Sequence, residues 1–309
     1  MKKNLLIIII LILSSSAITI AQQEKLLTHF IFDKMSINPG ATGMGMLNGI
    51  CGTAIYRNQW DRVNGAPNSA LLNAEANLSR YFPSAVGMSF YHDAIGFARQ
   101  NNVVLNYSYH LPLSNGALGI GVGLGLVSYG MAPEWVVPDD PLDPKLPQSV
   151  TESNLDANFG VYYMSNDGWY AGLSSVHLPA AELDLLNFST ARHYYAMAGY
   201  RQTEAFGVSR MDLDYNLLIR SDFVMTSADI NVRAIWDKMY YGGLTIRPSD
   251  AIGIMAGIQL PNNFMFGYSY DITINKMANI SAGSHELFVR YCYFLPPPPV
   301  TKSRNPRYL

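Results

Sequence analysis

Charged side chains are scarce in this sequence of 309 residues, where they make up 14% of the chain against ~25% in soluble domains. The formal net charge of −2 argues against nucleic acid as a partner. The two cysteines, Cys51 and Cys292, are too few for a disulfide framework. After Ala21, no uninterrupted apolar run reaches the ~18 residues typical of a membrane-spanning helix. These shortages argue against a nucleic-acid-binding protein, a disulfide-rich scaffold and a helical membrane protein.

Motifs of known catalytic or cofactor sites are also missing. The sequence has no phosphate loop, no HExxH, no CxxC and no Gly-x-Ser-x-Gly elbow. Ser89 and Ser108 lie near His92 and His110, but nearness in sequence is weak evidence for a catalytic triad. No two histidines have the spacing of zinc ligands on a helix; they are His29, His92, His110, His177, His193 and His285. We therefore expect no enzymatic activity, no cofactor and no metal site.

Residues 1–21 have the pattern of an export signal. Lys2 and Lys3 form a basic start, residues 5–13 form an apolar core, and Thr19-Ile20-Ala21 resembles a cleavage site. The apolar core is too short for a comfortable membrane span. No cysteine follows Ala21, so we expect cleavage of the leader without a lipid anchor.

The most informative pattern lies between Gly116 and Ser128, where aliphatic residues alternate with glycines. A strand places alternate side chains on opposite faces, so one face carries the aliphatic residues and the other only glycine. The aliphatic residues are Leu118, Ile120, Val122, Leu124 and Leu126, and the glycines are Gly119, Gly121, Gly123 and Gly125. Glycine inside a strand marks curvature or close approach of another group. We expect the aliphatic face to contact lipid, and the glycine face to leave room in a barrel lumen for residues 22–48.

Alternation continues along residues 49–294 and predicts about 14 strands. In residues 103–111, for example, Val103 and Leu105 share one face and Asn106 and His110 the other, which is tolerable if that side faces a wet lumen. In the second half we expect strands at 156–165, 169–176, 193–202, 211–219, 227–236, 239–247, 250–259, 264–271 and 284–294. Twenty tyrosines, thirteen phenylalanines and four tryptophans suit interfacial aromatic girdles.

The expected fold class is all-β, a closed antiparallel transmembrane β-barrel of about 14 strands in the bacterial outer membrane. An irregular N-terminal segment precedes the barrel and a short periplasmic tail follows it. A soluble periplasmic β-sandwich is the alternative.

The connections between the expected strands support the same count. Turn residues at 112–116, 165–168 and 261–263 mark short periplasmic turns, whereas residues 129–154 and 177–192 form long external loops. Pro248-Ser249 is the exception, a short link where a long one is expected.

The two long loops carry their own signals. Asp139, Asp140 and Asp143 could ligate calcium, but the glycine turn and terminal glutamate of an EF-hand loop are missing, so a solvated acidic loop is favoured. In the other loop, residues 180–186 could form a short amphipathic turn of helix.

Residues 295–309 differ from the barrel in composition. Pro296–Pro299 favour polyproline II geometry, and three basic residues follow without an acidic one. Because an even strand count puts both chain ends on the periplasmic side, the tail is expected in the periplasm, either disordered or docked on a partner. The candidate partner-binding residues are Lys302, Arg304, Asn305, Pro306 and Arg307.

Closure of the barrel pairs the first strand with the last. Cys51 lies near the beginning of the first strand and Cys292 near the end of the last, so we expect both near the periplasmic rim. A bridge would require Cα atoms within ~7 Å and suitable Cβ directions. Unpaired small hydrophobic residues are favoured over a disulfide.

Several short strings together resemble the PorP/SprF family, outer-membrane proteins associated with the type IX secretion system. The strings are Asn38-Pro39-Gly40-Ala41 with Gly43, Tyr56-Arg57-Asn58-Gln59-Trp60 with Gly65-Ala66-Pro67, Asp93-Ala94-Ile95-Gly96, and residues 106–116. The resemblance covers residues 30 to 294, and Arg304-Asn305-Pro306-Arg307 also looks similar. Three residues, Gly40, Thr42 and His92, depart from the usual pattern.

The resemblance implies a barrel without catalytic activity that supports export or surface attachment of large secreted adhesins, in some members linked to gliding motility. The partners implied are an adhesin or its C-terminal sorting domain, periplasmic type IX secretion components and outer-membrane lipid, without nucleic acid. The alternative is a small-molecule porin or a barrel that transports hydrophobic substrates. No reacting residue carries over from the family.

Overall fold

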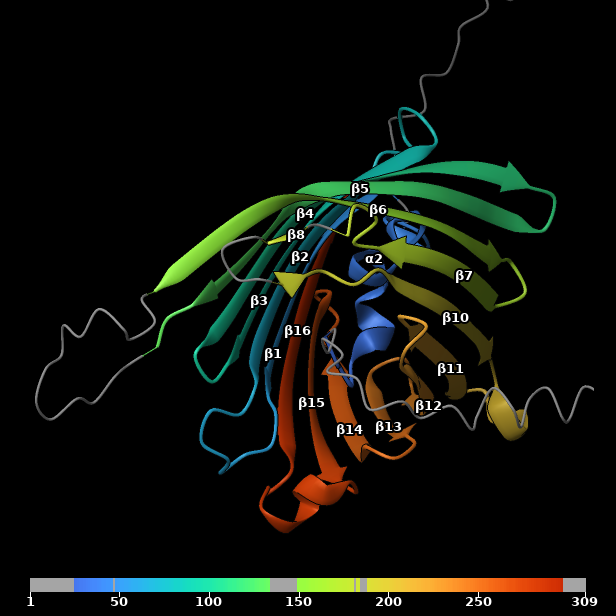
Figure 1. Ribbon diagram of the computed structural model, residues 1–309. Coiled ribbons are helices and arrows are strands. Elements are labelled where there is room, and N and C mark those ends of the chain that lie inside the picture. Colours follow the sequence, from blue (N-terminus) through green and yellow to red (C-terminus); the bar gives the residue numbers. More distant parts are fainter. Residues whose placement is uncertain (1–24, 47, 134–148, 181, 184–187, 297–309) are drawn as a thin grey trace, which may run out of the picture.

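The computed structural model describes residues 25–46, 48–133, 149–180, 182–183 and 188–296. In this part of the chain, fourteen antiparallel strands form one closed barrel, as the alternation predicts (Figure 1). Each strand pairs with its neighbours in sequence, and the last strand closes the barrel against the first. The strands are β1 (Gly49–Asn58), β2 (Asn68–Asn77), β3 (Ser84–Ile95), β4 (Ala98–Leu113), β5 (Gly116–Met131), β6 (Val150–Ser165), β7 (Trp169–Val176), β10 (His193–Gln202), β11 (Met211–Ser221), β12 (Thr226–Trp236), β13 (Tyr240–Arg247), β14 (Ala251–Gln259), β15 (Phe264–Thr273) and β16 (Ser284–Phe294).

The barrel has two unlike ends. The terminal rim is the end at which β1 begins and β16 ends; it also holds the connections after β2, β4, β6, β10, β12 and β14. The loop rim is the opposite end and holds the long connections after β5 and β7. The short link between β13 and β14 lies on the loop rim, as expected. Short 3₁₀ helices interrupt one connection at each rim, η3 (Ala205–Gly207) and η4 (Lys276–Asn279).

The long connections differ from expectation in two places. Strand β5 ends at Met131 and strand β6 begins at Val150, so both strands are longer than expected. Met131 and Val150 are register partners, and the ladder of hydrogen bonds continues to this pair. The three aspartates of that loop lie outside the described residues. Where a helical turn was expected near residues 180–186, the chain forms β8 (Glu182–Leu183), which pairs with β9 (Phe188–Ser189). A segment this short does not repay helix nucleation, whereas a hairpin supplies ladder partners.

The two faces of β5 confirm the predicted orientation. Leu124 is 65% exposed on the outside of the barrel, and Ile120, Val122 and Leu126 are exposed with it. The glycine face points inward: a Cβ at Gly121 would lie 2.2 Å from the carbonyl carbon of Pro39. The apolar outside and crowded inside are the arrangement of an outer-membrane barrel.

Exposed aromatic side chains gather next to the terminal rim. They lie at strand ends or in the β2–β3 turn, and rings at such a level sit at the boundary between lipid and water. The residues are Tyr81, Phe82, Trp169, Tyr200, Trp236, Tyr240, Tyr291, Tyr293 and Phe294.

The hydrophobic core lies inside the barrel and is built around the N-terminal segment. Residues 25–46, here called the plug, contain η1 (Phe30–Phe32), α2 (Lys34–Ile37) and η2 (Pro39–Ala41), and Figure 1 shows them in blue within the ring of strands. Phe30, Ile31 and Ile37 pack on residues of β6, β7, β10, β11, β13 and β14. Leu27 packs on β1, β2, β3 and β16 on the other side. The plug therefore contacts opposite walls of the lumen. No helix in the described ranges is long and apolar enough to cross a membrane.

Candidate functional site

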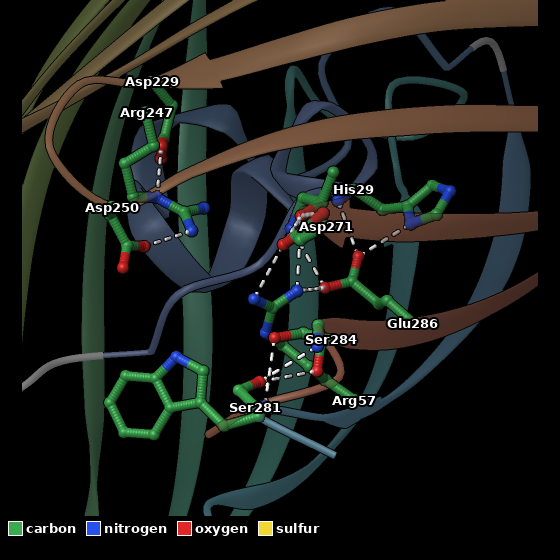
Figure 2. A network of polar contacts seen from close by, with 12 residues as sticks. His29, Arg57, Asp229, Arg247, Asp250, Asp271, Ser281, Ser284 and Glu286 are labelled. Atoms are coloured by element: carbon green, nitrogen blue, oxygen red, sulfur yellow. Dashed lines mark hydrogen bonds and ion pairs between the residues drawn. The ribbon is translucent and has the colours of Figure 1, made fainter. Parts of the chain in front are cut away.

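A fully buried ionic cluster fastens the start of the plug to β1, β15 and β16 (Figure 2). Glu286 accepts hydrogen bonds from the backbone N–H of Thr28 at 2.9 Å and of His29 at 2.7 Å, and its Oε1 lies 2.7 Å from His29 Nδ1. Arg57 bridges Asp271 at 2.7 Å and Glu286 at 3.2 Å. The Thr28 hydroxyl donates to the Asp271 carboxylate. We call these five residues the latch.

The carboxylates of the latch are paired rather than isolated, whereas His29 Nε2 and Arg57 Nε are buried without a hydrogen-bond partner in the described part of the chain. Glu286 is 0% exposed, so its charge would be costly without its partners. The rings of His29 and Phe32 stack on Phe288, with centroids 5.4 Å and 4.3 Å away. Charge pairing and ring stacking therefore hold the same short segment of the plug, from Thr28 to Phe32.

A second anchor is formed by Asn38, Pro39 and Gly40. The Asn38 side chain caps η2 by accepting from the Gly40 N–H at 2.9 Å and donates to the Val161 carbonyl at 2.9 Å. Gly40 packs directly on the glycines of the wall: a Cβ at Gly119 would lie 2.0 Å from the Gly40 carbonyl oxygen. Backbone can approach backbone this closely only where side chains are missing.

Of the serine and histidine pairs considered as catalytic candidates, Ser108 and His110 hold the plug instead. Ser108 donates to the Gly40 carbonyl at 3.1 Å, and His110 Nε2 lies 2.9 Å from the Thr42 carbonyl oxygen. His92 contacts Asn101 through Nδ1 at 2.7 Å. These residues do not form a triad.

Asp33 links the plug to β2. The Asn73 amide donates to it at 2.6 Å, the Ser36 hydroxyl donates as well, and Lys25 Nζ is 4.0 Å away. Burial raises the pKa of Asp33, and these neighbours counteract that effect.

Another ionic group lies near the loop rim, on β11, β12 and β13. Asp229 pairs with Arg220. It also pairs with Arg247, which lies 3.0 Å from Asp250 through another nitrogen (Figure 2). Arg220 also donates to the Lys25 carbonyl at 3.1 Å, so this group contacts the first described residue of the plug.

A cavity of about 750 Å³ lies between the plug and the terminal rim. Its floor includes Phe32 and Lys34 of the plug, and its walls include Tyr170, Arg201 and Arg290 of the barrel. We call this cavity the vestibule. Its volume is within the ~300–1,000 Å³ of ligand pockets.

The seam of the barrel carries a disulfide near the terminal rim. Cys51 and Cys292 are register partners of β1 and β16, with Cα atoms 4.1 Å apart and their sulfurs bonded. The preference for unpaired cysteines is therefore wrong. The expected position of both cysteines at the seam is confirmed, because ring closure aligns them although 241 residues separate them.

Replacing Cys51 and Cys292 together by serine is expected to lower the free energy of unfolding by about 2–4 kcal/mol, because the bond closes a long loop in the unfolded chain. The temperature at which the folded, fast-migrating gel band disappears measures the effect. Reduced wild-type protein is the control and should match the double variant. Equal melting of oxidised wild type and variant would contradict a stabilising role.

The candidate tail residues, Lys302 to Arg307, lie outside the described residues. Within the described ranges, no group of three or more His, Cys, Asp or Glu residues is placed to hold a metal ion.

Sequence reasoning missed the latch and Lys34. The available signal was that Arg57, Asp271 and Glu286 occupy positions whose side chains point inward. This signal was weak, because the inward faces of these strands tolerate polar residues in general. Nothing in the sequence pairs Arg57 with Glu286, which is 229 residues away.

Comparison with known proteins gives one family. Residues 19–291 match the family described as "Type IX secretion system membrane protein PorP/SprF". No curated protein matches the sequence significantly.

Solved structures with a similar shape are outer-membrane proteins of low identity. Omp33 of Acinetobacter baumannii is 7% identical, with 79% of this chain and 97% of that chain covered and a TM-score of 0.48. BamA of Haemophilus ducreyi lacking POTRA domains 1-3 is 10% identical, with 88% and 80% covered and a TM-score of 0.42. The KdgM porin is 8% identical, with 78% and 98% covered and a TM-score of 0.38.

Proposed function

Because the chain belongs to the PorP/SprF family of type IX secretion system membrane proteins, we propose that it supports export or surface attachment of large secreted adhesins, of the kind used in gliding. It is an outer-membrane β-barrel component of that system. In this role it acts without catalysis and contacts both the adhesin, or its sorting domain, and periplasmic secretion components.

The occupied lumen is the observation that supports this role most. A small-molecule porin needs a continuous water-filled path through the barrel. Here the plug is fastened to β1, β15 and β16 by the latch and to β5 and β6 by Gly40. A barrel filled in this way suits attachment and docking better than diffusion of solutes.

The proposed orientation places the terminal rim in the periplasm. Single-chain bacterial barrels have short periplasmic turns and long external loops, and the longest connections here lie on the loop rim. With that orientation, the leader at residues 1–21 is removed after export, and residues 295–309 extend into the periplasm.

Deletion of the gene tests the role directly. We expect loss of one or a few large adhesins from the cell surface, identified by mass spectrometry of surface and culture fractions, and rescue by the wild-type gene. Purified protein in planar bilayers should give no steady ohmic conductance. An unchanged set of exported proteins together with steady conductance would instead support the porin.

Removal of residues 302–309 is expected to leave the barrel folded but to reduce adhesin export. The last strand of the barrel, β16, ends at Phe294, whereas Lys302, Arg304 and Arg307 would steer the tail to an acidic partner surface. Export is measured by immunoblotting of the surface fraction, and folding by the heat-modifiable gel band. A full-length variant with these three residues changed to glutamine separates charge from length. Full export by both variants would reduce the segment to a passive tail.

A further inference from the structure

The lining of the vestibule has an excess of positive charge. Its cationic side chains are Lys34, Arg201, Arg233, Lys238 and Arg290. Its carboxylates are Glu75, Asp212 and Asp214. The cations thus outnumber the carboxylates by two, and a low-dielectric wall around such a cavity strengthens its attraction for anions.

The ion pairs in the cavity leave Lys34 without a carboxylate. Asp214 binds both Arg201, at 2.6 Å, and Arg233. Glu75 pairs with Arg290 at 3.2 Å. Among the described residues, no carboxylate oxygen lies within 4.0 Å of Lys34 Nζ, although the group lies on the floor of the cavity.

Aromatic rings hold the Lys34 ammonium in place. It lies 3.5 Å from the centre of the Tyr170 ring, and its Nζ donates to the Tyr162 hydroxyl at 3.2 Å. An ammonium has three donors, so this contact leaves capacity for an incoming acceptor. Tyrosine faces stabilise a cation without neutralising it.

Enclosure lowers the pKa of Lys34 to about 7, although its side chain remains partly open to the vestibule. Asp214 on β11 favours the charged form. The guanidinium groups of Arg201, Arg233 and Arg290, on β10, β12 and β16, disfavour it. An anion bound at Lys34 would favour the protonated form, so binding and protonation are coupled.

Arg233 provides a second group with unused hydrogen-bonding capacity. It is 7% exposed and packs with its guanidinium 4.7 Å from the centre of the Phe32 ring. Its Nε is buried and has no hydrogen-bond partner in the described part of the chain. Buried polar atoms normally have a partner.

The rest of the lining combines uncharged polar residues, such as Asn73 and Gln259, with apolar ones. The methionines among it include Met44, Met164 and Met265, and the inward-facing aromatic residues include Tyr170 and Tyr241. Methionine side chains are flexible and accommodate varied apolar partners. This combination suits a carboxylate flanked by apolar side chains better than a small inorganic anion. The barrel wall separates the cavity from lipid.

We propose that the vestibule binds an acidic peptide segment that enters at the terminal rim, with a carboxylate at Lys34 and Arg233 and apolar side chains against the methionines and aromatic rings. Only the periplasmic origin of the peptide rests on the proposed function. Binding itself depends on the cavity alone.

Binding of synthetic peptides to the full-length protein in detergent tests this inference. The probe is a fluorescein-labelled hexapeptide of alternating aspartate and phenylalanine, measured by fluorescence anisotropy at pH 6.0. We expect saturable binding, about tenfold weaker in Lys34→Met because a charge-assisted hydrogen bond is lost. Lys34→Arg should bind like wild type. Lys276→Met, an exposed lysine at the loop rim, is the matched control and should have no effect.

A change of pH gives an independent readout. Above pH 7, Lys34 loses its proton, so wild-type affinity should fall about tenfold between pH 6.0 and 8.5, whereas Lys34→Arg should change little. The comparison of wild type with Lys34→Arg tests the proposal even if Lys34→Met does not fold.

Three results would overturn the proposal. They are equal binding of a peptide with asparagine in place of aspartate, wild-type affinity in folded Lys34→Met, and full displacement of the peptide by millimolar sulfate, which would mean a small-anion site. Any of them would leave the adhesin-export role standing, whereas failure of that role would not affect peptide binding in detergent.

Discussion

Glu286→Gln is expected to destabilise the folded barrel by about 3–5 kcal/mol, the cost of breaking a buried ion pair by changing one partner. Glutamine keeps the shape, but Thr28 and His29 donate to different oxygens of Glu286, and glutamine retains only one acceptor oxygen. Arg57 also loses one of its two carboxylates. Unfolding in guanidinium chloride, followed by tryptophan fluorescence of protein in lipid vesicles, measures the change.

Asp237→Asn is the matched control for Glu286→Gln. Asp237 also pairs with an arginine, Arg210, but that pair lies in exposed connections at the terminal rim. Exposed pairs contribute little because water and salt screen them, so this variant should unfold like wild type. Similar unfolding of Glu286→Gln and wild type would mean that the latch does not hold the plug.

Gly121→Val is expected to push the plug away from β5. A Cβ at Gly121 would lie 2.2–2.4 Å from three backbone atoms of Pro39 and Gly40, and backbone cannot swing aside as a flexible side chain can. Overpacking of this kind costs about 1–3 kcal/mol. We expect a lower unfolding temperature and trypsin cleavage at Lys34, which the folded wild type should resist. Displacement of the plug should also produce steady conductance in planar bilayers.

Gly242→Val separates the effect of the plug from that of valine in a strand. Gly242 faces outward on β13, and the nearest atom to a Cβ there is the Met255 carbonyl oxygen at 3.8 Å. This variant should fold, resist trypsin and remain without conductance. If Gly121→Val behaved in the same way, the close approach of Gly40 to the wall would have no energetic importance.

The barrel could be predicted because its signal is local. Alternation in Leu118–Leu126 indicates which side chains face outward, and turn residues such as Asn166-Asp167-Gly168 indicate where strands end. At Glu182 and Leu183, where a turn of helix was considered, the chain instead pairs as a strand with Phe188 and Ser189 of the same loop. The predicted strands were too short at β5 and β6, because ladder pairing extends strands beyond their alternating residues.

The sequence by itself determined the architecture of this protein: the number of strands, the lipid-facing side of each, and the glycine face that leaves room inside. These features depend on residues that lie close together in the sequence. Only the tertiary structure decided how the plug is held in the lumen. The Arg57–Glu286 pair and the Cys51–Cys292 bond join residues 229 and 241 positions apart. The setting of Lys34 likewise combines rings and charges from several strands. Such contacts exist only after ring closure, because closure brings the strands that carry them around one interior.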